Sequence, residues 1–160
     1  MLRKYLDMKL GIVLFAVWLT LSGLLPLLGV LVSESSTWLA LLAVAAGALI
    51  LLGVSRQGWT KEAGMLVLGV WLLAIGLIEV VDLSFSHRDT LLNVLAVAAG
   101  ALVLPALRGE DASENLGWVA AGAWLIAWGL IPLLDLRFAN RETLLNVLAV
   151  ASGVLILLGR

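Results

Sequence analysis

The sequence DLSFSHRDTLLNVLAVA, which runs from Asp82 to Ala98, returns almost unchanged as DLRFANRETLLNVLAVA from Asp135 to Ala151. The two stretches begin 53 residues apart, since 135 − 82 = 53. The same interval separates Trp18-Leu, Trp71-Leu and Trp124-Leu, and it therefore reaches back to the start of the chain. A period held without slippage over the whole sequence predicts a repeated structural unit.

Each unit contains a long apolar run, a short polar tip and a shorter apolar run, which is the pattern of a helical hairpin. The sequence predicts one all-α membrane domain over 1–160, with three tandem hairpins at about 10–54, 63–107 and 116–160. The expected helices lie near 10–32, 37–54, 63–83, 90–107, 116–136 and 143–159.

Lipid is the expected solvent, because 62% of the residues are hydrophobic and only 13% are charged. Soluble domains are about 45–50% apolar and about 25% charged. A helix rises about 1.5 Å per residue and the hydrocarbon core is about 30 Å thick, so the first helix of each pair is long enough to cross. The second helices, at roughly 17 residues, are at the lower limit for crossing.

The N-terminus is basic, as in a signal peptide, but the apolar run after Lys9 reaches Val32. A signal peptide has an apolar region of about 7–15 residues, so we interpret this run as a retained first membrane helix.

The basic residues predict the orientation of the expected hairpins. The side that carries the termini and linkers has Arg3, Lys4, Lys9, Arg56, Lys61, Arg108 and Arg160. The side of the tips has Arg88, Arg137 and Arg141. Cytoplasmic loops are enriched in Lys and Arg, so a multi-pass protein of the inner membrane with cytoplasmic N- and C-termini is expected.

Small residues predict how the helices pack, because helices associate in lipid through close backbone approach. Stripes of small residues follow the second helices, as at Ala40, Ala43 and Gly47, and glycines follow the first helices, as at Gly69 and Gly76. We expect each hairpin to close its own glycine stripe against its own small stripe. The hairpins would then form a pseudo-threefold bundle or a linear row, and the sequence leaves both open.

Carboxylates lie at the tip ends of two first helices, as Glu79, Asp82 and Asp135. Asp82 and Asp135 recur together with Arg88 and Arg141, so we interpret them as headgroup-level residues that are solvated or paired across the tip. Glu79 has proline at both equivalent positions. It is therefore the better candidate for a specific role, because ionisable residues at membrane depth are often functional.

Two further sets recur with the repeat. Asn93 and Asn146, in the first turns of second helices, are expected to hydrogen-bond across the hairpin or to hold a neighbouring helical turn, and a ligand contact is the alternative. Trp18, Trp71 and Trp124 lie well inside the first helices, although tryptophan prefers the membrane interface. Packing is the favoured interpretation, and the alternative is that these tryptophans, with Glu79, line a seam that binds a flat lipophilic ligand.

The groups needed for most chemistry are missing. The chain has no cysteine and only one histidine, His87, so thiolate sites and multi-histidine metal sites are excluded. No expected helix carries a charge near mid-membrane, which argues against an ion-coupled transporter. No nucleophile–base set can be assembled and no basic face suits nucleic acid. We therefore expect a protein that is not an enzyme and has no cofactor, metal or nucleic-acid partner.

The segments Trp18–Pro26 and Trp124–Pro132 share the pattern Trp-Leu-x-x-x-Gly-Leu-x-Pro. With the polar tips and the Ala/Gly-rich second helices, they resemble small bacterial hairpin-repeat membrane proteins. The layout is similar to the HdeD-like acid-resistance family, and the Trp/Pro placement is similar to SPW-repeat proteins. The resemblance implies a bacterial inner-membrane protein with an accessory role, and it transfers no functional residue.

Two functions are compatible with these features. The first is a non-catalytic scaffold or accessory subunit that packs with itself or with other membrane proteins in the bilayer. The alternative is a carrier or binder of a small or lipophilic ligand, such as a lipid, quinone or pigment, in a cavity between the hairpins.

Overall fold

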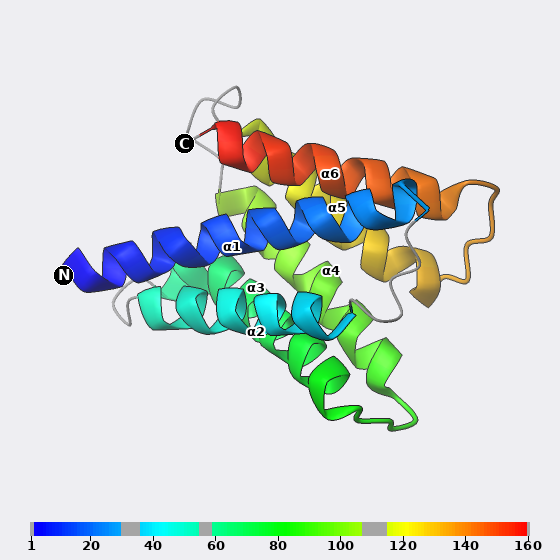
Figure 1. The fold of residues 1–160 in the computed structure, drawn as a ribbon, viewed down its shortest axis with the longest axis horizontal. Coiled ribbons are helices and arrows are strands. Elements are labelled where there is room, and N and C mark those ends of the chain that lie inside the picture. The colour runs from blue at the N-terminus through cyan, green and yellow to red at the C-terminus, as the bar shows by residue number, and fades with distance from the viewer. Residues whose placement is uncertain (1, 30–35, 55–58, 107–114, 160) are drawn as a thin grey trace.

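The computed structural model describes residues 2–29, 36–54, 59–106 and 115–159, and the regular secondary structure within them is helical (Figure 1). The helices are α1 (Leu2–Leu27), α2 (Ser36–Gly53), α3 (Trp59–Val81), α4 (Arg88–Ala106), α5 (Leu116–Leu133) and α6 (Arg141–Leu158). The all-α prediction is confirmed. The predicted bounds of the first helix are wrong at both ends, because α1 begins well before residue 10 and ends at Leu27 rather than at residue 32.

The first helices of the hairpins end at a left-handed residue. Gly29, Asp82 and Asp135 have φ values of 69°, 53° and 48°. The N–H groups of Asp82 and Leu83 donate to the carbonyls of Glu79 and Ile78, at 3.4 and 3.0 Å, which is the pairing of a Schellman motif. Glycine and aspartate tolerate this conformation better than a β-branched residue does. The apolar run toward Val32 therefore does not extend α1, because the backbone turns at Gly29.

The six helices form a closed ring. Each helix packs against the next one in the chain, and α1 packs against α6. The N- and C-termini lie at one end of this ring, and the α3–α4 and α5–α6 connections lie at the other, which we call the terminal end and the tip end (Figure 1). The contact between α1 and α6 closes the ring, so the helices do not form a linear row.

The glycine stripes pack between hairpins, and the expectation that they close each hairpin is wrong. A Cβ atom at Gly76 in α3 would lie 2.7 Å from the carbonyl oxygen of Ala40 in α2, the last helix of the preceding hairpin. Gly129 in α5 meets the carbonyl of Asn93 in α4 in the same way. Gly23 in α1 meets α6, which closes the ring. The contacts recur at an interval of 53 residues, since 129 − 76 = 76 − 23 = 53.

Within each hairpin the close approach lies nearer the terminal end. A Cβ atom at Gly11, Gly64 or Gly117 would lie 2.6–2.9 Å from a backbone nitrogen of the partner helix. These nitrogens belong to residues 50, 103 and 156, which are again 53 residues apart. Every helix is therefore held to one neighbour near the terminal end and to the other by a stripe that reaches toward the tip end.

The outer surface of the ring is apolar. Within the described residues, four helical segments are long and apolar enough to cross a membrane: Leu2–Leu27, Glu62–Val81, Leu116–Leu133 and Arg141–Leu158. Large hydrophobic side chains on their outer faces are exposed, such as Leu77 and Val147. An apolar surface this extensive is not typical of a soluble monomer and indicates a multi-pass membrane protein.

Candidate functional site

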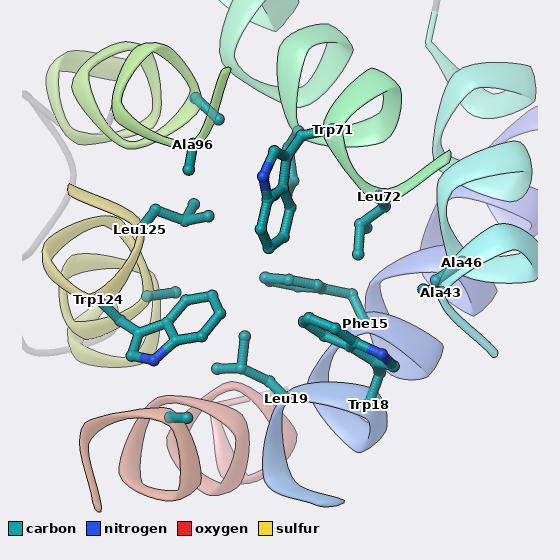
Figure 2. Close-up of a cluster of buried hydrophobic side chains, with 14 of the residues drawn as sticks. Phe15, Trp18, Leu19, Ala43, Ala46, Trp71, Leu72, Ala96, Trp124 and Leu125 are labelled. Atoms are coloured by element: carbon teal, nitrogen blue, oxygen red, sulfur yellow. The ribbon is translucent and has the colours of Figure 1, made fainter. Parts of the chain in front are cut away.

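Three indole rings fill the middle of the ring. Trp18, Trp71 and Trp124 come from α1, α3 and α5 and point toward one another (Figure 2). Their centroids lie 5.9, 6.3 and 6.0 Å apart, and the ring planes cross at 77–81°. Edge-to-face pairs in this range stabilise by about 0.5–1.5 kcal/mol beyond their buried area. We call these three residues the tryptophan cluster.

The cluster joins helices whose backbones are not neighbours. In the described chain the backbones of α1, α3 and α5 do not approach one another, because α2, α4 and α6 alternate with them around the ring. Their tryptophan side chains meet in the middle. The exposed fractions of Trp18, Trp71 and Trp124 are 8%, 0% and 4%. Trp71 also donates its indole N–H to the carbonyl of Leu92 in α4, at 3.1 Å. Large side chains are needed here because a ring of six helices would otherwise enclose a void.

One helical turn beyond the cluster, toward the tip end, the side chains that face the middle of the ring differ in size from helix to helix. The residues four positions after the three tryptophans are Ser22, Ile75 and Trp128. Trp128 continues the packing, with centroids 5.4 Å from Trp71 and 6.3 Å from Trp124. Serine occupies much less volume than an indole, so space remains beside α1.

That space consists of two adjoining cavities, which we call the hollow. One cavity of 180 Å³ is lined by Trp18, Ser22, Leu39, Ala40, Ala43, Ile75, Gly76 and Glu79. The second, of 360 Å³, is lined by Trp18, Ser22, Pro26, Ile75, Trp124, Trp128, Glu142, Leu145, Asn146 and Ala149. Trp18, Ser22 and Ile75 belong to both linings. The hollow is therefore an apolar space with a few polar groups, as binding sites between helices commonly are.

The structure brings part of the predicted site together. Trp18 and Glu79 line the smaller cavity of the hollow, and Trp18 and Trp124 line the larger one. Trp71 is fully buried under the other rings and lines neither cavity. Its role in the described structure is to pack and to hydrogen-bond.

The recurring tip residues lie outside the hollow. Asp82 and Asp135 are exposed, and their left-handed backbone gives a reason for their recurrence. Asp135 pairs with Arg137 at 3.1 Å, and Arg88 pairs with Asp89 at 3.2 Å. The described ion pairs are thus between near neighbours in the chain. Of the two expected alternatives, the exposure of Asp82 and Asp135 matches solvation, and no described ion pair joins either aspartate to Arg88 or Arg141.

The two recurring asparagines have different surroundings. Asn93 is buried in α4, and its carbonyl oxygen is the contact point for Gly129. Asn146 in α6 makes the equivalent contact with Gly23 and also lines the larger cavity. The difference follows from the neighbouring residue, because the space that Ser22 leaves open in α1 adjoins Asn146.

The lining residues that were not predicted as site residues include Ser22, Trp128 and Glu142. For Ser22 and Trp128 the signal is a break in the repeat, since 22, 75 and 128 hold Ser, Ile and Trp at equivalent positions. Glu142 lies in the first turn of α6, next to Arg141. Among the described residues, no three His, Asp or Glu side chains are close enough together to hold a metal ion.

Comparison with known proteins gives no further information on the function. No protein-family model, curated protein or solved structure matches the chain. The resemblance to HdeD-like and SPW-repeat proteins therefore stays a prediction.

Proposed function

We propose that this protein is a six-helix membrane protein that binds a small amphiphilic molecule in the hollow and catalyses no reaction. The observation that carries the proposal is the pair of cavities meeting at Trp18 and Ser22. Their walls are mostly apolar, and the carboxylates of Glu79 and Glu142 belong to exposed residues at the tip end. A molecule with an apolar body and one polar group matches this distribution.

The proposed topology has all six helices crossing, as three tandem hairpins related by a pseudo-threefold axis. The glycine contacts that recur every 53 residues support it. α2 has 18 residues, which extend over about 27 Å at about 1.5 Å per residue. This length matches a thin hydrocarbon core. With the termini in the cytoplasm of a bacterial cell, the hollow would face the outer side of the inner membrane.

Accessibility labelling tests this topology. Single cysteines are placed at His87, at Asn140 and at Leu2 in the otherwise cysteine-free chain. A membrane-impermeant maleimide added to intact cells should label the first two and not the third. Labelling of His87 and Asn140 from opposite sides would contradict the topology. The remaining tip, near Glu34, lies outside the described residues.

A scaffold role has less support than binding. The scaffold prediction is based on the abundance of small residues, which suggests packing against other proteins. The described stripes instead pack against helices of the same chain, as Gly47 does against Gly69 in α3 and Gly153 does against Ala16 in α1. These residues are therefore already used inside the ring.

Photo-cross-linking tests binding in the hollow. The purified full chain is reconstituted with an uncharged long-chain alcohol that carries a diazirine at its chain end, irradiated, and mapped by peptide mass spectrometry. We expect labelling of α1, α3 and α6 residues of the lining above the background on the outer faces. The variant Ser22→Phe places a phenyl ring where the two cavities meet and should reduce that labelling. The matched control Val147→Phe adds the same ring on an exposed face of α6 and should leave it unchanged.

The contrary outcomes are equally clear. Labelling spread evenly over the exposed faces, with none above background in the lining, would refute the proposal. So would lining labels that persist unchanged in Ser22→Phe. Circular dichroism and gel filtration of each variant establish that the compared proteins are folded.

A further inference from the structure

Among the described residues, the charged groups in the lining of the hollow are all acidic. The smaller cavity contains Glu79 and the larger contains Glu142, and no described lysine or arginine belongs to either lining. Both cavities include Trp18 and Ser22, so the two carboxylates flank a shared space. A molecule placed in that space would meet negative charge from α3 and from α6.

These carboxylates differ from the other acidic residues at the tip end. Asp89 and Asp135 each form an ion pair with a nearby arginine, at 3.2 and 3.1 Å. In the part of the chain that the structure describes, no ion pair joins Glu79 or Glu142 to a basic side chain. Their charges are therefore not neutralised by described neighbours.

The aromatic lining favours the same sign of ligand charge. Trp18, Trp124 and Trp128 contribute indole rings to the larger cavity. The face of an indole is the negative end of its quadrupole and attracts cations, including quaternary ammonium groups that cannot donate a hydrogen bond. An anion would face these rings and the carboxylates together without a basic partner. The carboxylates and the indole rings thus both favour a cation over an anion.

We propose that the ligand of the hollow is a lipophilic cation, meaning a molecule with one delocalised or alkylated positive charge on an apolar body. The apolar part would occupy the space left by Ser22, and the charge would lie between Glu79 and Glu142. This inference rests on the proposed binding function and specifies its ligand class.

Two ions of nearly equal shape and opposite charge test it. Tetraphenylphosphonium and tetraphenylborate are titrated separately by equilibrium dialysis against the purified full chain in a non-ionic detergent, with protein-free micelles as the blank. Exposed ion pairs contribute about 0.2–1 kcal/mol, which corresponds to a factor of about three per carboxylate. The chain should therefore bind the phosphonium at least about ten times more tightly than the borate.

Variants assign that preference to the hollow. Glu79→Gln and Glu142→Gln should each weaken phosphonium binding to the chain about three-fold, and the double variant should weaken it about ten-fold. Each affinity is corrected for phosphonium uptake by protein-free micelles. Asp89→Asn removes a tip-end carboxylate outside the hollow and should change the affinity by less than about two-fold. This control separates a local effect from general attraction of cations to an acidic surface.

Equal affinity for the two ions, or an unchanged affinity in the double variant, would overturn the inference. If the uncharged alcohol probe still labels the lining and Ser22→Phe still reduces that labelling, the binding function stands and only the ligand class is wrong. If that labelling also fails, the binding function itself is wrong.

Discussion

Replacing Gly76 with alanine should weaken the contact between α2 and α3, whereas the same change at Gly69 should not. A Cβ atom at Gly76 would lie 2.7 Å from the carbonyl oxygen and 2.9 Å from the amide nitrogen of residues 40 and 44 in α2. At Gly69 the nearest atoms are the side-chain carbons of Leu51, at 2.8 and 2.9 Å. A leucine tip can rotate away, but the backbone of a helix cannot.

The magnitude follows from these distances. Ordinary contact begins at 3.4 Å, so α3 must move from α2 by about 3.4 − 2.7 = 0.7 Å in the Gly76→Ala variant. A gap of about 0.5–1 Å loses a quarter to a half of each dispersion contact, and overpacking typically costs about 1–3 kcal/mol. Alanine returns about 0.5–1 kcal/mol of helix propensity. The expected net loss of unfolding free energy is about 1–2 kcal/mol for Gly76→Ala and close to zero for Gly69→Ala.

The assay is unfolding in mixed micelles of increasing SDS fraction, followed by tryptophan fluorescence and by circular dichroism. The two variants carry the same substitution on the same face of α3, so the difference between their unfolding free energies reflects the atoms that each new Cβ meets in α2. Equal stability of the two variants, or a more stable Gly76→Ala, would refute the assignment of that contact to the backbone of α2.

Two further predictions concern the cluster and the helix ends. Trp71→Phe removes the indole N–H that donates to Leu92, and it should lower the unfolding free energy by about 1 kcal/mol or more in the same SDS titration. Asp82→Val places a β-branched residue at φ 53° and should be about 1 kcal/mol less stable than Asp82→Gly, which tolerates that angle. Equal unfolding free energies of Asp82→Val and Asp82→Gly would contradict the left-handed backbone conformation at the end of α3.

Much of the helical architecture could be predicted from the sequence, because apolar runs and polar tips mark the helices directly. The boundary of α1 could not be predicted, because Gly29 lies inside an apolar run and hydrophobicity does not report a left-handed turn. The helix partners were predicted wrongly for a physical reason. A strict repeat places Gly76 at a fixed interval from equivalent small stripes in both α2 and α4, and periodicity alone cannot distinguish these two partners.

The candidate site could be predicted only in part. The recurrence of Trp18, Trp71 and Trp124 at interior positions pointed to a central seam, where the structure places all three rings in mutual contact. The hollow depends instead on a departure from the repeat. Ser22 stands where the other copies have Ile75 and Trp128, and the small side chain leaves space only because α1 closes the ring against α6.

Closure of the ring between α1 and α6 is the claim on which the cluster and the hollow both depend. A Cβ atom at Gly153 in α6 would contact the hydroxyl oxygen of Thr20 and would lie 2.6 Å from the backbone carbonyl oxygen of Ala16 in α1. The two helices must therefore separate by about 3.4 − 2.6 = 0.8 Å, which leaves cysteines at positions 20 and 153 within disulfide reach. In the cysteine-free background, Thr20→Cys with Gly153→Cys should form an intramolecular disulfide under mild oxidation in the membrane, seen as a reducible shift on a gel. Thr20→Cys with Val94→Cys in α4 should not. No intramolecular disulfide from the first pair, or equal cross-linking of both pairs, would contradict the closed ring.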